Sequence, residues 1–468
     1  MSYPTASFPD LNFHLGDRRL NRRAASCLRQ LLSRDMTKGF PRIFEDQHQL
    51  KAFYRLMNNP KTTPQKLIRG SWDGLANYFQ RQYQASGSPV VIKAYQDSTA
   101  GKFSERKKLD LGYLQTNSKR DNGVFIHTTI ACDQQGHPRG IFDQQFIQRQ
   151  RGEFGKKKDR KTRPFEDKES FKWVAWLEGL KQWREQLDYP VKIMTIADRE
   201  GDVAEVINAL VKDDFDFIIR SSHNRNTASG TDKLHDLLKQ SQPLESFVDT
   251  RRLHTRQSGK YYEAECRISY GTFQLRGIDQ PLQAVHLKEC QANADQQQAE
   301  WFVLTSCELS SPEQARQVVD DYQQRWPITE DFHMSLKTGA KMEKRQFDTA
   351  PALFNAIAML SLAALRIMAM RYVGQSNGEQ PLEESGLVSD PIVYDLLPQL
   401  SSKYLKGRDF DFCQPGTVQW FHILIARMGG HQGYAQKGRP GWRILWEGYL
   451  ELERLVAGAR LYKQSTYG

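Results

Sequence analysis

The sequence lacks the features of membrane, secreted and zinc-ribbon proteins. It has no uncharged apolar run of the roughly 18 to 20 residues that a membrane helix needs, and its start, Met1-Ser2-Tyr3-Pro4, lacks the basic-then-apolar pattern of a secretion signal. Its 6 cysteines in 468 residues lie far apart and never form a C-x-x-C pair. We therefore expect a soluble cytoplasmic protein whose cysteines are buried apolar residues.

Positive charge is in surplus. The chain has 66 Lys and Arg against 55 Asp and Glu, a net charge of +11, and a pI near 9.2. Hydrophobic residues make up 39% and aromatic residues 11% of the chain, which argues against global disorder. The length suits two to four folded domains, and nucleic acid is the first partner to consider.

The first 70 or so residues have helical periodicity. One helix is predicted after Asp17 as N-cap, a second through Leu50–Met57 that ends at Asn58-Asn59-Pro60, and a third that begins at Thr63-Pro64 and continues through Phe79. The apolar positions of the first helix are Leu20, Ala24, Cys27, Leu28, Leu31 and Leu32. Its other faces carry Arg18, Arg19, Arg22, Arg23 and Arg29. This basic face is either solvated or in contact with phosphates.

The middle of the chain alternates strands and helices, which predicts an α/β core. Val90–Tyr95 is expected to form a buried strand that ends at Asp97, and a helix is expected over Phe171–Leu187. Further strands are predicted from Val124, Val191 and Phe215. A basic run between Arg149 and Arg163 is either a solvated loop or a mobile segment that follows a phosphate backbone.

The rest of the chain changes character twice. Residues 242–307 are β-rich and predict an inserted β subdomain, with a hairpin around Gly259 and another turn at Gly271. A long helix is predicted over Pro351–Tyr372. The tail from Pro391 is expected to be helical, with glycine breaks at 429–430 and 438–441.

Three acidic positions stand out. Asp97 and Asp198 each follow a predicted strand, where carboxylates of neighbouring strands can share a divalent metal, although a strand-terminal Asp is also a common turn former. A third cluster runs from Tyr322 to Gly339. If a helix begins near Thr329, with Pro327 just before it, one helical stripe holds Glu330, His333 or Met334, and Lys337.

Several motifs in the same order resemble the IS4 family of DDE transposases. Those that carry the acids and their neighbours are AYQDST, ADREGD and YQQRWPITEDFHMSLKTG. The resemblance extends over nearly the whole chain, through LGDRRLNRR, AFYRLMNNP, IIRSSHNR, EWFVLTS and GWRILWEGYLEL. Because these motifs are independent of one another, a chance match is very improbable.

The resemblance implies a catalytic triad of Asp97, Asp198 and Glu330. Glu330 is matched because six residues separate it from Lys337, as in the family. The chain departs from the family in one respect: four residues, rather than three, lie between Arg325 and Glu330. This insertion leaves Asp331 as a minor alternative for the third acid.

The resemblance also implies the chemistry and the partners. The triad would hold Mg²⁺, with Mn²⁺ able to substitute, for a nick, a hairpin intermediate, hairpin opening and strand transfer into target DNA. Trp301 would support an extruded base; by spacing alone it is a core tryptophan. The expected phosphate contacts are Tyr322, Arg325 and Lys337, with Arg220 and His333 as neighbours. Arg18, Arg19, Arg22 and Arg23 would bind the transposon end.

The implied fold is an RNase H-like α/β catalytic core with an inserted β subdomain, flanked by helical domains. We expect an N-terminal DNA-end-binding domain at 1–70, a catalytic domain at 71–373 with the insertion at about 240–300, and a C-terminal dimerisation domain at 374–468. The partners would be double-stranded DNA, both transposon ends and target, and a second copy of the chain, in the bacterial nucleoid. The alternatives are a metal-dependent nuclease of the same fold and a non-catalytic DNA-binding inhibitor of transposition.

Overall fold

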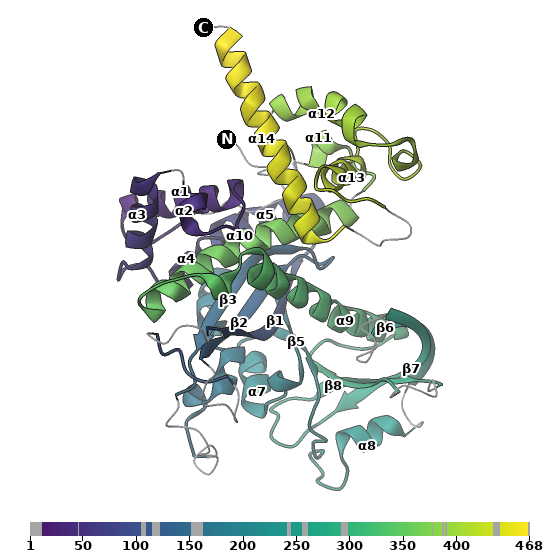
Figure 1. Ribbon diagram of the computed structural model, residues 1–468. Helices are drawn as coiled ribbons and strands as arrows, with labels where there is room; N and C mark the ends of the chain where they lie inside the picture. The colour runs from purple at the N-terminus through teal and green to yellow at the C-terminus, as the bar shows by residue number, and fades with distance from the viewer. Residues whose placement is uncertain are drawn as a thin grey trace. The chain divides into compact units, whose positions relative to one another are not determined.

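The computed structural model (Figure 1) divides into two compact units. Unit 1 comprises Met1–Gly87, Ser98–Phe154 and Glu330–Gly468, and unit 2 comprises Ser88–Asp97 and Gly155–Thr329. The structure describes residues 12–44, 46–103, 109–114, 122–150, 162–240, 245–254, 261–291, 298–376, 378–385, 388, 391–433 and 440–466. The predicted domain boundaries near residues 70 and 373 stay predictions.

Unit 2 is built on one mixed sheet. Its strands lie in the order β1-β4-β5-β9-β8-β7-β6. The bounds are β1 (Val90–Lys102), β4 (Val191–Ala197), β5 (Asp216–Arg220), β6 (Glu245–His254), β7 (Tyr261–Phe273), β8 (Leu282–Glu289) and β9 (Glu300–Thr305). β1, β4 and β5 are parallel. The neighbouring pairs from β5 through β9, β8 and β7 to β6 are all antiparallel. The predicted strands from Val124, Val191 and Phe215 are confirmed, and so is the mixed α/β class.

The expectation that the first strand ends at Asp97 is wrong. β1 continues to Lys102, so its residues up to Asp97 belong to unit 2 and its residues from Ser98 to unit 1. The backbone stays extended because pairing continues: the amide of Phe103, just past the strand, donates to the carbonyl of Asn122, beside β2 (Gly123–Cys132), at 2.8 Å. Asp97 is therefore a strand residue, not a turn former.

The β-rich segment pairs as a continuous antiparallel ladder. β6 and β7 flank Gly259, as the hairpin prediction requires, although Gly259 itself lies outside the described residues. The turn predicted at Gly271 is wrong, because Gly271 lies inside β7 and pairs with Ala284 of β8. A glycine inside a strand weakens it without ending it when both neighbours stay paired.

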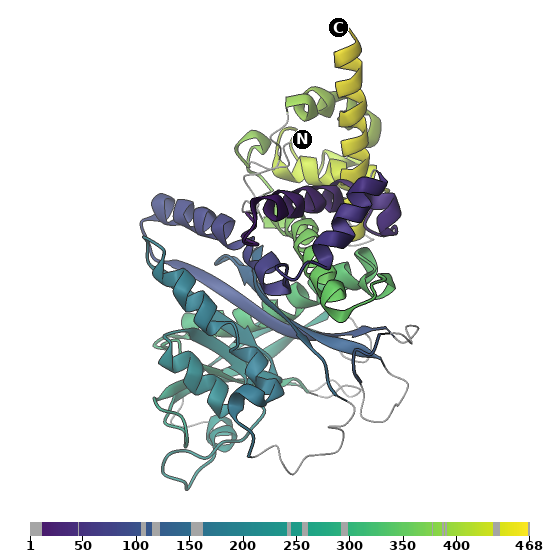
Figure 2. The same ribbon diagram turned by 90° about the vertical axis from the view of Figure 1, so that its left-hand side faces the viewer.

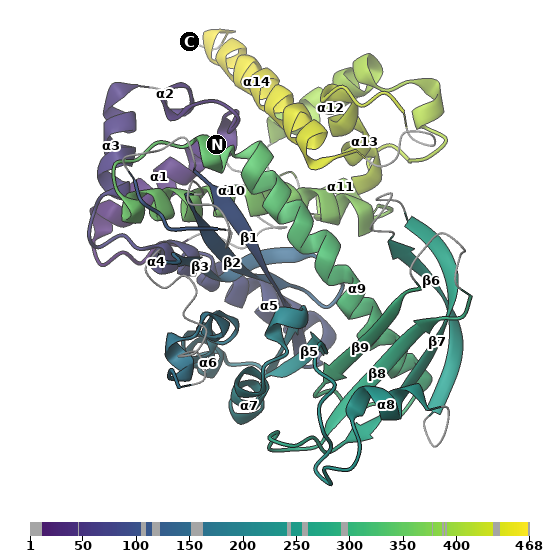
Figure 3. The same ribbon diagram turned by 60° about the horizontal axis from the view of Figure 1, so that its bottom comes forward.

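The described part of unit 2 also contains α-helices. They are α6 (Leu177–Glu185), α7 (Ala204–Lys212), α8 (Leu234–Lys239) and most of α9 (Pro312–Met334). The helix predicted over Phe171–Leu187 is shorter than expected, because a 3-10 helix at Glu169–Trp173 precedes α6. Figure 3 shows α9 alongside the strands β9 and β8, and Arg251 of β6 forms an ion pair with Asp320 of α9.

The predicted start of a helix near Thr329 is also wrong. α9 begins at Pro312 and contains Pro327 in its interior. Proline removes one helical N–H and usually bends or breaks a helix, but the apolar positions Val318, Val319 and Tyr322 before it are buried and hold the helix in place. A π-helical turn, Ser335–Gly339, follows α9.

The N-terminal helices of unit 1 form largely as predicted. They are α1 (Arg18–Ser33), α2 (Phe40–Ile43), α3 (Gln47–Met57), α4 (Pro64–Arg69) and α5 (Trp72–Ser86). Asp17 and Thr63 cap α1 and α4 with their side chains, as expected. The third predicted helix is two helices that separate at Gly70. A Cβ at Gly70 would lie 2.7 Å from the ring of Phe13, so only glycine fits there.

Helix α10 (Ala350–Ser376) organises the remainder of unit 1 and confirms the predicted long helix. Its Asn355 side chain donates to the carbonyls of Met57, at 2.9 Å, and Thr62, at 3.0 Å, which fixes the N-terminal helices beside it (Figure 2). The hairpin of β2 and β3 (Pro138–Ile147) packs on α10 through stacked rings of Phe146 and Phe354. Strand β3 was not predicted.

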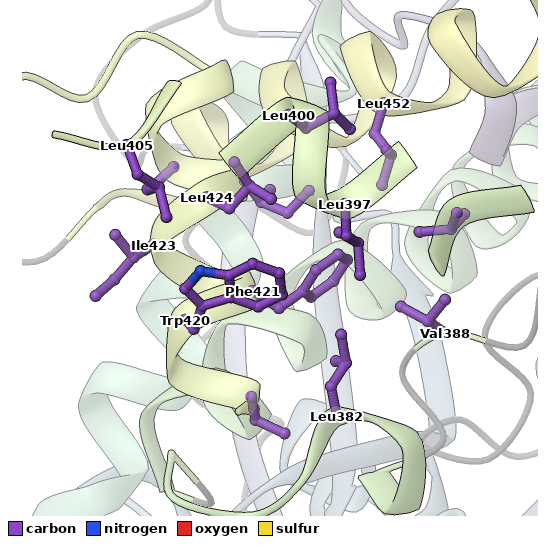
Figure 4. Close-up of a cluster of buried hydrophobic side chains, with 14 of the residues drawn as sticks. Leu382, Val388, Leu397, Leu400, Leu405, Trp420, Phe421, Ile423, Leu424 and Leu452 are labelled. Carbon is purple, nitrogen blue, oxygen red and sulfur yellow. The ribbon is translucent and has the colours of Figure 1, made fainter. Parts of the chain in front are cut away.

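The C-terminal helices have their own apolar core (Figure 4). They are α11 (Leu382–Ser385), α12 (Pro391–Tyr404), α13 (Val418–Met428) and α14 (Trp442–Thr466). The predicted glycine break at 429–430 lies between α13 and α14, and Gly429 and Gly448 let the two backbones touch, since a Cβ on either would overlap the other helix. None of the described helices is long and apolar enough to cross a membrane.

Candidate functional site

Asp97 and Asp198 lie at equivalent positions on neighbouring parallel strands. In the β1–β4 register Tyr95 pairs with Ile196, so each aspartate lies two residues beyond one member of that pair. Asp198 directly follows β4 and caps the 3-10 turn Arg199–Gly201 by accepting a hydrogen bond from the Glu200 amide at 2.9 Å. The sheet of unit 2 thus brings the two predicted acids to the same edge.

A row of polar contacts joins one face of β1 to α9. Lys93, Tyr95 and Asp97 share that face because side chains alternate along a strand. The Lys93 ammonium pairs with Asp321 at 2.6 Å, with both groups buried. The hydroxyl of Tyr95 donates to Gln324 at 3.0 Å. These contacts set the register of α9 on the strand one turn before the residues that reach Asp97.

Asp97 receives two groups from α9. Thr329 Oγ1 lies 3.1 Å from Asp97 Oδ2 and shares its proton between that oxygen and the Arg325 carbonyl at 3.0 Å, and Arg325 Nη1 lies 3.4 Å from the same Asp97 oxygen. Arg325 is 6% exposed, also donates to the Gln96 carbonyl at 3.4 Å, and its Nε has no hydrogen-bond partner among the described residues. The guanidinium is therefore held beside Asp97, with its buried Nε unpaired among the described residues.

The electrostatics couple the two aspartates through Arg325. Burial raises the pKa of the Asp198 carboxyl; the Arg325 charge opposes this shift and the Asp97 charge adds to it. Burial alone would lower the pKa of Arg325, but Asp97, Tyr322 and Asp198 outweigh it, so that pKa lies above its ordinary value. Two carboxylates that repel each other in a partly desolvated place favour a shared cation.

An aromatic and cationic row extends the site along unit 2. Arg325 lies 5.9 Å from the ring centroid of Tyr322. Tyr322 meets Trp301 edge-on at 5.8 Å between centroids, and Arg220 lies 5.7 Å from the Trp301 ring. The structure thus brings together four residues that the sequence predicted to contact DNA. Trp301 is half-buried at the start of β9, so it is not a fully enclosed core residue.

Asp202 has a role that the sequence did not predict. It is fully buried and accepts hydrogen bonds from the amides of Ser222 at 2.7 Å and His223 at 2.9 Å. Arg225 Nη2 pairs with its other oxygen at 2.5 Å. The carboxylate therefore fixes the loop that follows Arg220. The sequence signal for this role is that Asp202 is the second Asp of the motif ADREGD, whose first Asp is Asp198.

The third acid lies in unit 1, in the last turn of α9. Glu330 directly follows Thr329 and is exposed. Its alternative, Asp331, accepts from Arg371 Nη1 at 2.5 Å and from the Tyr372 hydroxyl at 3.2 Å, both on α10. Asp331 is thus engaged in helix packing, which leaves Glu330 as the available carboxylate.

The other predicted residues of this segment have mixed surroundings. His333 is buried, whereas Met334 is exposed, so the exposed stripe that starts at Glu330 continues through Met334. Lys337 is half-buried in the π-helical turn. Within the described ranges no group of three or more His, Cys, Asp or Glu side chains is arranged to hold a metal ion, and metal binding by the triad stays a prediction.

The basic residues of the N-terminus face outward. On α1, Arg18, Arg19 and Arg22 are exposed and Arg23 is half-buried, while the predicted apolar positions, Leu20, Ala24, Cys27, Leu28, Leu31 and Leu32, are all buried. The other basic run, Arg149 to Arg163, lies outside the described residues at 151–161. At its start, Arg149 packs over the ring of Phe125 at 4.0 Å.

Residues 5–62 match a known family model, described as transposase DNA-binding. The matched region contains α1 to α3 and ends two residues before α4. The exposed arginines of α1 therefore belong to a region similar to transposase domains that bind DNA. The match supports a transposase, and hence a DNA-processing enzyme with DNA as its partner.

Proposed function

We propose that the protein is a cut-and-paste DNA transposase of the IS4 family, of the type of the Tn5 (IS50) transposase. The observation that carries the proposal is the placement of Asp97 and Asp198 at one sheet edge beside Arg325, in a chain whose residues 5–62 match a transposase DNA-binding family. The paired aspartates suit phosphoryl transfer, and the family match indicates that the substrate is DNA.

The strand arrangement supports an RNase H-like catalytic core. In unit 2, β1, β4 and β5 are parallel, with Asp97 on β1 and Asp198 directly after β4, and β2 and β3 form an antiparallel hairpin in unit 1. Strands β6 to β8 come from the segment between Asp198 and Glu330, as a β insertion would. In such sheets ligands bind at the carboxyl ends of the parallel pairing. Asp198 directly follows β4, and Asp97 lies two residues past the last β1 residue that pairs with β4.

The donor chemistry fits a divalent cation. Asp97 and Asp198 present hard carboxylate oxygens, and each gains from an added positive charge because the other aspartate lies nearby. Asp97, Asp198 and Glu330 would hold Mg²⁺, or Mn²⁺ in its place. The bound cation would supply Lewis-acid stabilisation of the developing phosphoryl charge and an activated water or 3′-hydroxyl.

The protein's own residues would position the DNA strand. Arg325, which lies beside Asp97, would hold a phosphate there, and Tyr322 and Lys337 would contact neighbouring phosphates. Trp301, with Tyr322 on one side and Arg220 near its ring, would stack with a base extruded at the hairpin. His333 would support this group. A second copy of the chain would complete a synaptic dimer through the C-terminal helices.

Product analysis tests the proposal. Matched inverted repeats beside the coding region would supply the substrate, an end-labelled duplex incubated with the purified protein and Mg²⁺. The proposal predicts a nick, then a hairpin on the transposon end, then a product joined to a target plasmid. Nicks that never proceed to hairpin or joined product would make the protein a metal-dependent nuclease. Binding without any cleavage would make it a non-catalytic DNA-binding protein.

A further inference from the structure

The connection between α12 and α13 carries an exposed group of cationic and aromatic side chains. Phe410 is 43% and Phe412 is 50% exposed, and Lys403, Lys406 and Arg408 beside them are exposed as well. We name the segment Lys403–Phe412 the cation–phenylalanine loop. Exposed apolar side chains that gather in one place and are rimmed by polar residues mark interaction sites, whereas single ones are ordinary.

Contacts with α13 and with the C-terminal core hold this loop in one conformation. Asp409 is fully buried between the exposed side chains and forms a two-pronged ion pair with Arg427 of α13, with Nη2 at 2.6 Å and Nε at 3.1 Å. Its Oδ2 also accepts from the Lys406 amide at 2.9 Å. Leu405 (Figure 4) and Cys413 anchor the two ends, because both belong to the C-terminal core. The exposed phenylalanines are thus presented by a braced turn.

The charge balance of the loop selects a polyanion. Because Arg427 neutralises Asp409, the surface charges are Lys403, Lys406 and Arg408 against Asp411 alone. Contacts between protein copies usually exclude lysine from their centres, whereas DNA-bending proteins surround apolar wedges with cations. Phenylalanines separated by one residue, with cations before them, fit the second pattern.

We propose that the cation–phenylalanine loop is a binding site for double-stranded DNA. Lys403, Lys406 and Arg408 contact phosphates, while Phe410 and Phe412 enter a groove and wedge between base steps, which bends the duplex. This contact uses residues other than the acids of unit 2 and the arginines of α1. It goes beyond the proposed function and does not depend on cleavage.

The test uses the full chain and a generic labelled duplex without transposon-end sequence, titrated at several KCl concentrations. The Lys403→Ala/Lys406→Ala/Arg408→Ala variant is expected to bind about tenfold or more weakly at low salt and to lower the log–log salt slope by about two to three, near 0.9 for each phosphate that is no longer neutralised. The control, Lys212→Ala/Lys233→Ala/Lys288→Ala, removes three exposed lysines of unit 2 and should bind as the wild type does.

The phenylalanines are tested by bending. Phe410→Ala/Phe412→Ala should keep the salt slope, bind several-fold more weakly, and lose the energy transfer between dyes at the duplex ends that reports a bend. Phe410→Leu/Phe412→Leu keeps an apolar wedge and should retain the energy transfer. It is the control for a general disturbance of the loop by substitution at these positions. Wild-type affinity and slope in the triple variant would overturn the proposal. So would variants that alter only self-association or only binding to anionic vesicles.

The outcomes separate this inference from the proposed function. A chain that never cleaves DNA, but whose loop variants lose generic duplex binding, would contradict the proposed transposase and leave the loop assignment standing. A chain that cleaves and joins DNA with unaltered generic binding in the loop variants would do the reverse.

Discussion

Thr329 Oγ1 lies 3.1 Å from Asp97 Oδ2, and its one proton is shared among that carboxylate and the helix carbonyls of Arg325, at 3.0 Å, and Trp326, at 3.3 Å. Thr329 follows Arg325 by one helical turn, so both side chains reach the same carboxylate from one face of α9. In the IS4-family pattern, the residue at this spacing from the arginine is the catalytic glutamate. Here a threonine has that place and Glu330 comes next.

Replacing this threonine should impair catalysis more than binding. Thr329→Val keeps the shape and removes the donor, and a hydrogen bond to a charged group contributes about 1.5 to 3 kcal/mol, so cleavage should slow by roughly 10- to 100-fold. Thr329→Ser, which retains the hydroxyl, should stay within a few-fold of wild type. Single-turnover cleavage and end-binding affinity are the measurements. Equal rates in the valine and serine variants would show that the hydroxyl does not position Asp97.

The neighbouring acids Glu330 and Asp331 should separate catalysis from stability. Glu330→Ala removes the proposed third acid, so cleavage should be abolished. Because this carboxylate is exposed, the melting temperature should not change. Asp331→Ala removes the hydrogen bonds from Arg371 and Tyr372, so the free energy of unfolding should fall by about 1 to 3 kcal/mol. Below its melting temperature that variant should still cleave. The opposite assignment, with cleavage abolished only in Asp331→Ala, would place the third acid at Asp331.

Acid stability should depend on Asp133, which joins β2 to β3. Burial raises the pKa of this carboxyl, but hydrogen bonds from His137 and the charge of Arg139 outweigh it and lower the pKa to about 2. A depressed pKa stabilises the fold above the unfolded value of 3.8, and this contribution disappears as pH falls toward about 2. The difference in unfolding free energy between wild type and Asp133→Asn should shrink from about 2 kcal/mol at pH 6 to near zero at about pH 2. Urea titrations measure it, and a constant difference would contradict the assignment.

The arginines of α1 should govern binding to the transposon end. Alanine at Arg18, Arg19, Arg22 and Arg23 should weaken end binding and lower the log–log salt slope by about 0.9 for each phosphate that is no longer neutralised. The apolar face of the helix is untouched, so circular dichroism should show wild-type folding. A salt slope that does not change would mean that this face is only solvated.

The sequence predicted the elements that local physics determines. Asp17 and Thr63 are caps because their side chains bond to amides within three residues, and the apolar stripe of α1 follows helical spacing. Extended apolar runs likewise located β4 and β5. Such signals lie within a few residues, so they can be recognised without the fold.

Features that depend on distant residues were not predictable in the same way. β1 passes Asp97 because pairing continues beyond it, and Pro327 lies inside α9 because earlier residues anchor that helix. The partner of Thr329 is Asp97, 232 residues away. The nearest of the loop amides that bond to Asp202 belongs to Ser222, 20 residues away. The sequence does contain a signal for the packing of α9 against β1. Polar residues alternate along β1, at 93, 95 and 97, and each contacts a polar residue of the helix.

Cleavage of an end-labelled transposon-end duplex by aspartate variants decides whether the paired acids are catalytic. Asp97→Asn and Asp198→Asn keep the side-chain shape and remove the negative charge. We expect each to lower the single-turnover cleavage rate in Mg²⁺ by about 10³-fold or more, equivalent to roughly 4 kcal/mol, while end binding is preserved. Wild-type cleavage by either variant would contradict the catalytic role of the two aspartates.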